Sequence, residues 1–290
     1  MSTDPALAGL VRTIRLSDRQ LAGVLMAYAD DAAHLIADLS LQEGVGAKVR
    51  AAQLKTVQAQ LRRMQAQMWP RIQRLTEQSM EKADDEAAQA AAVLDAVTSR
   101  ALGRSSEALK SSWEQQARAS VSAFVARERA GVRRKLSARV YKNQALSQQL
   151  VEAAIRRGVA LGKSSREMAS DVKGLIRPDT PGGISYSAMR LARTEIANAH
   201  HTAQVVAQQG VPWVDGFKWN LSGSHPRPDI CNEYADHGVW SRGDVPKSKP
   251  HPHCLCYLTP ALMPRAEFIS RLKRGDFDDF LSSTGAARAG

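Results

Sequence analysis

Apolar residues recur every three or four positions along the first part of the chain, which is the period of an amphipathic helix. One stripe follows Ser17-Asp18-Arg19-Gln20, which has the form of a helix capping box, and comprises Leu21, Val24, Leu25, Tyr28, Ala32, Leu35, Ile36 and Leu39. Gly44 and Gly46 end this helix. A second stripe has the spacing of a coiled-coil seam and comprises Leu54, Val57, Leu61, Met64, Met68, Ile72 and Leu75. Because Pro70 lies inside it, we expect a kink or a break near Trp69.

The helical period continues into the middle of the chain. Residues 81–101 are rich in Ala and are predicted to form a helix that ends near Gly103. A longer helix is predicted to begin at Ser105 or Ser106. Its apolar stripe comprises Leu109, Trp113, Ala117, Val121, Phe124, Val132, Leu136 and Val140. Stripes of this kind are typical of helix-packing surfaces.

After Leu146 the pattern predicts two shorter helices that divide at Gly158–Gly162. Ser164 and Glu167 form a second capping box, and the apolar face that follows comprises Met168, Val172, Leu175 and Ile176. A further helix over residues 185–209 is predicted to bury Met189, Ala192, Ile196, Ala199, Ala203 and Val206, with Gly210 as its C-terminal cap.

Beyond Gly210 the sequence changes from Ala and Gln to Gly, Pro and Trp. The short runs GFKWNLS, HGVWS and CLCYLTP are predicted to be strands of a small sheet. The tail from Arg265 to Gly275 is predicted to form one more helix, and LSSTGAARAG is expected to be disordered.

These patterns predict a mainly α protein with a small α+β C-terminal domain. A long N-terminal helical hairpin or bundle is followed by a compact domain of helices and short strands that carries a zinc site. The expected divisions are an N-terminal helical region (1–104), a basic long helix or connector (105–145), the compact domain (146–262), and a C-terminal helix with a flexible tail (263–290).

Composition narrows the class of protein. Hydrophobic residues make up 43% of the chain, which permits a core, but aromatic residues make up only 5%, which argues against several thick cores. No apolar run is long enough to span a membrane, and the N-terminus lacks the charged-then-apolar layout of a signal peptide.

The net charge of +11 is unevenly placed. From Ser105 to Thr180 there are 15 Lys and Arg residues against 7 Asp and Glu residues, whereas both flanking regions are close to neutral. A basic middle predicts a polyanionic partner, with DNA the first candidate, although a solvated helix face explains the charge equally well. The side chains expected to contact phosphates are Arg127, Arg129, Arg133, Arg134, Lys135, Arg139 and Lys142.

All three cysteines and four of the seven histidines lie between His225 and Cys256. An odd count of cysteines clustered with histidines indicates a metal and a reducing cytoplasm better than disulfides. Three Cys and one His form a standard tetrahedral zinc set, so we predict a structural zinc held by Cys231, His251, Cys254 and Cys256. If Cys254 and Cys256 lie on a strand, they point to the same face. Competing ligands are His253, His225, His237 and Asp229.

Two other interpretations of the cysteines are open. They can pack as small hydrophobic side chains, or one of them can act as a nucleophile beside a histidine. Arg193 and Glu195 form a further charged pair on an otherwise apolar helix, and we expect them to have a structural role, although a transferase or nuclease site is the alternative.

Taken together, the motifs from Leu146 to Pro260 resemble the phage head morphogenesis domain of Mu F-like and SPP1-type minor capsid proteins. The resemblance is carried, in order, by GKSSREMASDV, LARTEIANAHHTA, GFKWNLS, Asp229-x-Cys231 and His251-Pro-x-Cys254-x-Cys256. This chain departs from the family where many members have a second Cys, since it has Tyr234, and where an Arg is usual, since it has Leu255.

The resemblance implies a non-enzymatic minor head protein, made in the bacterial host cytoplasm and located inside the capsid. Its expected partners are the portal protein, the major capsid or scaffold protein, and the packaged double-stranded DNA, which it would contact without reading sequence. No membrane partner is expected. The alternative is an enzyme or toxin delivered with the virion that acts on nucleic acid or protein through the Cys/His cluster.

Overall fold

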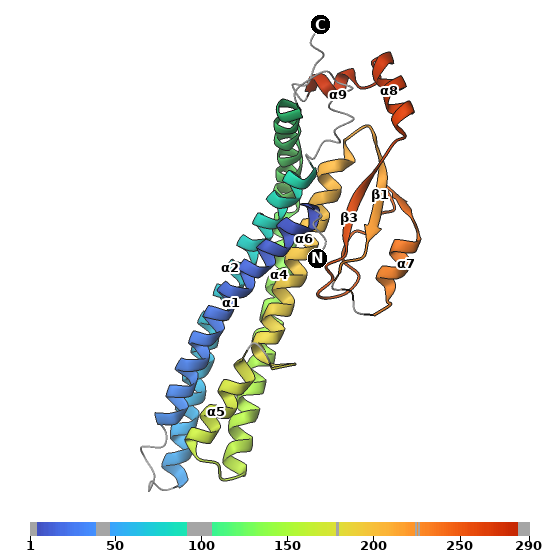
Figure 1. The fold of residues 1–290 in the computed structure, drawn as a ribbon. Coiled ribbons are helices and arrows are strands. Elements are labelled where there is room, and N and C mark those ends of the chain that lie inside the picture. The colour runs from blue at the N-terminus through green and yellow to red at the C-terminus, as the bar shows by residue number, and fades with distance from the viewer. Residues whose placement is uncertain are drawn as a thin grey trace. The chain divides into compact units, whose positions relative to one another are not determined.

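The fold was described from a computed structural model (Figure 1), which covers residues 5–38, 47–91, 106–177, 180–223, 225 and 227–283. For residues 5, 6, 47–51, 91, 106–113 and 129 it describes the backbone alone. The chain is mostly helical with a small antiparallel sheet near the C-terminus, which confirms the predicted fold class. Its described elements are α1 (Pro5–Ala37), α2 (Ala47–Ala91), α4 (Ser106–Ala160), α5 (Ser165–Ile176), α6 (Ile184–Gln209), β1 (Val214–Asn220), α7 (Ile230–Asp236), β2 (Val239–Ser241), β3 (Tyr257–Leu262), α8 (Arg265–Arg274) and α9 (Asp278–Ser283).

The chain divides into two compact units. Unit 1 contains residues 1–14, 79–130 and 194–290, and unit 2 contains residues 15–78 and 131–193. Helices α1, α2, α4 and α6 each contribute residues to both units. The predicted divisions at residues 104, 145 and 262 stay predictions.

Unit 2 is a helical unit whose core matches the predicted stripes. Of the α1 stripe, Leu21, Leu25, Tyr28, Ala32 and Ile36 expose 4% or less of their surface. Of the α2 stripe, Val57, Leu61, Met68 and Ile72 are buried. The predicted positions Leu39, Gly44, Gly46 and Gly103 lie outside the described residues, as do the side chains of Leu109 and Trp113.

The predicted start of the first helix is wrong. The helix α1 begins at Pro5, so Ser17 does not start it but is 1% exposed in its interior. The helix α2 continues through Pro70 to Ala91, so no break occurs there, and the kink stays a prediction. The buried Trp69 beside this proline donates its indole N–H to the Ser147 hydroxyl of α4 at 3.0 Å, and this bond fastens α2 to α4 where the proline removes one backbone donor.

The prediction that a separate helix starts after Leu146 is also wrong, because α4 continues without interruption to Ala160. The division at Gly158–Gly162 is confirmed, since Gly162 adopts a left-handed φ of 66° in the turn after α4. The second capping box is confirmed in full: the Ser164 side chain accepts from the Glu167 N–H, and the Glu167 side chain accepts from the Ser164 N–H.

The sheet of unit 1 has the strand order β2-β1-β3, with both neighbours antiparallel to β1. Phe217 and Trp219 point from β1 into a buried cluster with the three cysteines, Val245 and Leu258. The helix α7 packs against β1 (Figure 1). Pro260 occupies the edge strand β3 and lacks a backbone donor, which discourages pairing with a further strand.

Arg242 closes the end of α6, a role that the sequence assigned to Gly210. Its guanidinium donates to the backbone oxygens of Gln209 at 2.9 Å, Val211 at 2.9 Å and Val214 at 2.6 Å. Gly210 is not among the residues with a positive φ, so the left-handed cap expected there does not form.

A second small core of unit 1 lies at the C-terminus. Trp213 packs edge-on against Phe268, Phe277 and Phe280, which come from α8 and the segment that leads into α9. The predicted helix after Arg265 is confirmed as α8. The disorder predicted from Leu281 is wrong for residues 281–283, which belong to α9, and residues 284–290 lie outside the described part. In the described helices, no segment combines the length and apolar character needed to cross a membrane.

Candidate metal centre

The cluster begins at the first turn of α7. Asp229 caps this helix, and its Oδ1 accepts the Cys231 N–H at 2.7 Å. Asn232 completes the capping box by accepting the Asp229 N–H at 3.0 Å. The short helix is therefore held at its start, and the Cys231 side chain is fully buried against the sheet.

The other donors lie on the loop that leads into β3. Cys254 donates its backbone N–H to the His251 carbonyl at 3.4 Å, and His253 between them has a φ of 62°, in the left-handed region. The strand predicted over Cys254 and Cys256 begins only at Tyr257, so that prediction is wrong. The expected consequence nevertheless holds, because Cys254 and Cys256 are 2% and 1% exposed while Leu255 is half-buried.

The donor atoms approach one another closely. The Cys231 Sγ lies 3.2 Å from the His251 Nε2 and 3.5 Å from the Cys254 Sγ. The Cys256 Sγ lies 3.9 Å from the His225 Nδ1. A tetrahedral metal with sulfur ligands at about 2.3 Å places its ligand atoms about 3.8 Å apart, so these distances fit such a site. Two groups of three donors share Cys231, and the cluster of Cys231, His251, Cys254 and Cys256 can hold a metal ion.

Both histidines direct one ring nitrogen to a sulfur and the other to an oxygen. The His251 Nδ1 lies 3.0 Å from the Pro252 carbonyl, which can only accept, while its Nε2 faces the Cys231 Sγ. The His225 Nε2 lies 2.9 Å from the Asn232 Oδ1, while its Nδ1 faces the Cys256 Sγ. Holding one ring nitrogen as a donor is how proteins orient metal-binding histidines.

The Asp229 carboxylate lies beside the converging Cys and His donor atoms. Its Oδ2 lies 3.2 Å from the His251 Nε2, close enough for an ion pair when His251 is protonated. Its contacts with the Cys231 N–H and with His251 also lower the pKa of the Asp229 carboxyl, the backbone hydrogen bond being the larger cause.

The remaining competing ligands lie apart from the sulfurs. His237 stacks on Trp240, with ring centroids 3.8 Å apart. His253 belongs to neither group of converging donors among the described residues. Of the four competing ligands that the sequence allowed, His225 therefore joins a group of converging donors, and Asp229 lies beside His251 without joining one.

The thiols are not equivalent. A hydrogen bond with Cys254 lowers the pKa of Cys256 to about 5, whereas the same bond, followed by burial, raises the pKa of Cys254. Burial raises the pKa of Cys231 to about 12. One thiolate therefore forms readily in the metal-free cluster, and a thiolate is the form of cysteine that binds metals.

The surroundings of the cluster combine aromatic rings with one cation. Lys249 is 7% exposed, donates its ammonium to the Cys256 carbonyl, and lies 5.2 Å from the Trp219 ring centroid. Trp219 packs edge-on against Tyr234, at 5.1 Å between centroids. The three cysteines pack in this hydrophobic cluster, which is compatible with the cluster also holding a metal ion.

Two adjacent histidines of α6 lie buried in the same unit. His201 donates its Nε2–H to the Pro246 carbonyl at 2.6 Å, while neither ring nitrogen of His200 has a hydrogen-bond partner among the described residues. Burial, and then the charge of Lys249, lowers the pKa of each to about 3. Both imidazoles are therefore neutral at physiological pH.

Arg193 and Glu195 belong to different units. The Arg193 guanidinium makes two hydrogen bonds to Asp18 of α1, at 2.9 and 3.0 Å, and so joins α6 to α1 within unit 2. Asp18 lies 175 residues away in the chain, so local spacing could not indicate this partner. Glu195 is 7% exposed and belongs to unit 1.

The predicted phosphate-binding residues lie on α4. Arg127, Arg133, Arg134, Lys135, Arg139 and Lys142 are exposed, and the Arg129 side chain lies outside the described residues. Arg127 belongs to unit 1 and the other five to unit 2. Arg133 is directed to Glu77 of α2, at 3.8 Å, whereas the spacing of Lys135, Arg139 and Lys142 places them on one face of the helix.

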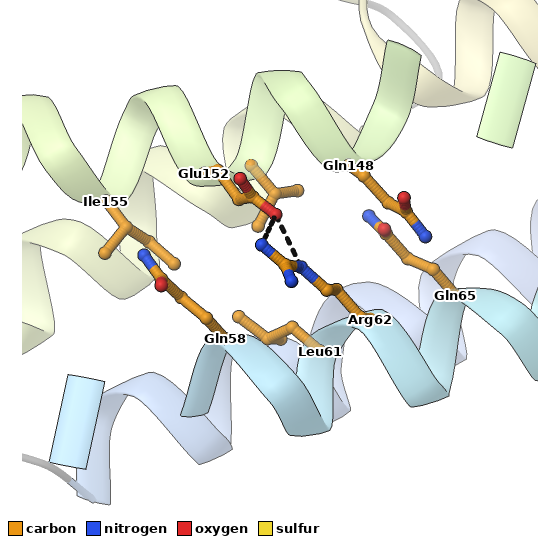
Figure 2. A pocket seen from close by; sticks show the side chains of 8 residues that line it. Gln58, Leu61, Arg62, Gln65, Gln148, Glu152 and Ile155 are labelled. Atoms are coloured by element: carbon orange, nitrogen blue, oxygen red, sulfur yellow. Dashed lines mark hydrogen bonds and ion pairs between the residues drawn. The ribbon is translucent and has the colours of Figure 1, made fainter. Parts of the chain in front are cut away.

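A shallow recess between α2 and α4 carries the ion pair of Arg62 and Glu152, with Nε and Oε1 2.7 Å apart (Figure 2). Glutamines and aliphatic side chains surround the pair: Gln58, Leu61, Gln65, Gln148, Val151 and Ile155. Arg62 and Glu152 both belong to unit 2, so the pair joins two parts of one unit and indicates no chemistry.

Sequence reasoning missed Lys249 and His200 as neighbours of the cluster. The signal in the sequence is weak, because a Lys in a Pro-rich loop and a His on an Ala-rich helix are ordinary surface residues.

Compared with known proteins, the chain matches no family model, no curated protein and no solved structure. The resemblance to phage head morphogenesis proteins therefore stays a prediction.

Proposed function

We propose that this chain is a phage minor capsid protein that acts in head morphogenesis, associates with the portal inside the procapsid and contacts packaged DNA. The observation that carries the proposal is the closed character of the Cys/His cluster. Its sulfurs are buried in the core of the sheet, and its nearest carboxylate, Asp229, is already bound to the Cys231 N–H and His251. A catalytic zinc keeps a position open to water, whereas a structural zinc does not.

The metal in this proposal is a structural zinc. Cys231, Cys254 and Cys256 would hold it with His251, and His225 is the alternative fourth ligand. Bound zinc would fix α7 and the loop before β3 to each other, and so stabilise a sheet too small to be stable alone. Elemental analysis of the purified full chain should find about one zinc per molecule, lost on Cys254→Ser.

DNA contact is proposed for Lys135, Arg139 and Lys142, which share one exposed face of α4. Binding to a random duplex should weaken steeply as salt rises, because the phosphates release counterions. The double variant Lys135→Glu/Lys142→Glu should lower the slope of log K against log salt by about 2. Lys218→Glu/Lys247→Glu alters the same charge on exposed residues of unit 1 and should leave the slope unchanged.

The proposed place in the virion is tested on particles. Mass spectrometry of purified particles from the phage or prophage that carries the gene should find the chain, protected from external protease. Its absence from DNA-filled particles would contradict the proposal. Zinc-dependent turnover of DNA, RNA or a nicotinamide cofactor that disappears on substitution of Glu195 or His253 would establish the enzymatic alternative instead.

A further inference from the structure

One flank of α4 in unit 2 exposes aliphatic side chains beside its buried face, whereas two other exposed apolar residues of this stretch, Tyr141 and Val159, lie on the opposite side of the helix from Val132. Val132, Leu146 and Leu150 expose 40%, 47% and 36% of their surface. Residues seven positions apart lie nearly in line along a helix. Positions 132, 139 and 146 form one such row, and positions 143, 150 and 157 form a second row directly beside it. We call the residues of these rows the α4 seam: Val132, Arg139, Asn143, Leu146, Leu150 and Arg157.

The seam is distinct from the face of α4 that enters the core. The residues of that inner face expose 2% or less of their surface: Leu136, Val140, Ser147, Val151 and Ile155. The seam runs beside this face, so its aliphatic side chains extend the apolar surface of the unit into solvent. Apolar groups in register on a helix are typical of a surface that receives a second helix.

Charge indicates what kind of helix would fit. From Arg129 to Val151 the chain contains six Lys and Arg residues and no Asp or Glu. Lys135 and Lys142 border the seam, and Arg139 interrupts its aliphatic row. A second copy of this chain would bring the same charge and be repelled, whereas acidic side chains would pair with these cations. Duplex DNA would match the cations but would leave the leucines exposed to water.

We propose that the α4 seam is a docking site for an acidic amphipathic helix of another protein. The partner helix would place aliphatic residues every seven positions against Val132, Leu146 and Leu150, and a carboxylate opposite Arg139. Leu146 and Leu150 are one turn apart, so they would take a single aliphatic side chain between them. The inference is drawn from unit 2 alone and does not depend on DNA binding.

The experiment uses the full chain and a fluorescent synthetic peptide of about 28 residues, which is four heptads with Leu at the core positions and Glu at the flanking ones. A scrambled peptide of the same composition and a random DNA duplex are measured beside it. Leu146→Ser/Leu150→Ser should weaken binding of the patterned peptide about ten-fold or more and leave DNA binding unchanged. Arg139→Glu, which removes no aliphatic group, should also weaken peptide binding.

Tyr141→Ser is the matched control. Tyr141 is 67% exposed on the same basic segment, but it lies half a turn away from Val132, so its removal should not change peptide binding. If the scrambled peptide binds as tightly as the patterned one, net charge alone explains the binding and the proposal is overturned. Unchanged peptide binding by both seam variants, or loss of DNA binding by the leucine variant at an unaltered melting temperature, would overturn it too.

Discussion

The helical unit 2 and the small sheet of unit 1 are stabilised in different ways. In unit 2, aliphatic residues at a helical repeat are buried in small increments along α1, α2, α4 and α5, together with hydrogen bonds such as that from Trp69 to Ser147. The sheet instead concentrates its core in Phe217, Trp219 and three thiols. A distributed core tolerates the loss of one contact, whereas a concentrated core depends on a few groups.

The difference follows from size. A three-stranded sheet with a helix of seven residues cannot bury enough apolar surface to offset the entropy of ordering its loops. The loop from Val245 to Cys256 has little regular structure, yet it carries most of the converging donors. The proposed metal would supply at that point the cross-link that packing alone does not.

Metal removal should produce the largest difference in stability between the sheet of unit 1 and the helices of unit 2. A chelator should destabilise the sheet by several kcal/mol, since metal binding contributes directly to the folding of small sites, while unit 2 keeps its helices. The measurement is thermal unfolding followed by far-ultraviolet circular dichroism for the helices and by tryptophan fluorescence, in which Trp213, Trp219 and Trp240 report on the sheet region and Trp69 on unit 2.

His251→Ala should reproduce the effect of the chelator, and His253→Asn is its control. Asn tolerates the left-handed φ of 62° at position 253, so this variant should unfold like the parent chain. A metal-free preparation with unchanged unfolding would sink the idea that the sheet needs a metal.

Truncating a buried side chain should cost the sheet of unit 1 more free energy of unfolding than it costs the helical core of unit 2. Phe217→Ala is expected to cost about 3–5 kcal/mol and to unfold the sheet, because this fully buried ring lies among the thiols. Val57→Ala removes a smaller side chain from the aliphatic core of unit 2, and should cost about 1–2.5 kcal/mol. Chemical denaturation followed by both probes measures the two costs, and equal losses would remove the contrast between the regions.

Acid should weaken unit 1 before unit 2. His200 and His201 have a folded-state pKa of about 3, below the value near 6.5 expected in the unfolded chain. The unfolded state therefore binds more protons between these values, so stability that is present above pH 6.5 is lost as the pH falls towards 3. The melting temperature should decline from pH 7 to pH 5.

His200→Leu should reduce that decline. Neither ring nitrogen of His200 has a hydrogen-bond partner in the described part of the chain, so the apolar replacement should cost little at pH 7. A parent chain and variant with parallel pH profiles would show that other groups cause the acid sensitivity.

The smallest effect is expected at the capping box of α5 in unit 2. Ser164→Ala removes the hydroxyl that accepts the Glu167 N–H and should cost about 1 kcal/mol. Ser170→Ala, an exposed position within the same helix, should be neutral or slightly stabilising, because Ala is the better helix former. A larger cost for Ser164→Ala would mean that unit 2 is less tolerant of single losses than its distributed core implies.

The sequence alone determined what depends on local spacing. Helical repeats located the helices, Ser164 and Glu167 located the start of α5, and the crowding of Cys and His located the metal cluster. These features follow from residues a few positions apart, whose geometry is the same in any fold.

Tertiary structure decided what depends on distant partners. Trp69 binds Ser147, 78 residues away, and α2 continues through Pro70 where local rules allowed a break. The carbonyls after α6 are satisfied by Arg242 instead of a glycine cap. His225 joined the cluster, and Lys249 was buried beside it, because β1 and α7 bring their loops together. Spacing predicts which side chains share a face, but only the folded chain determines which faces meet.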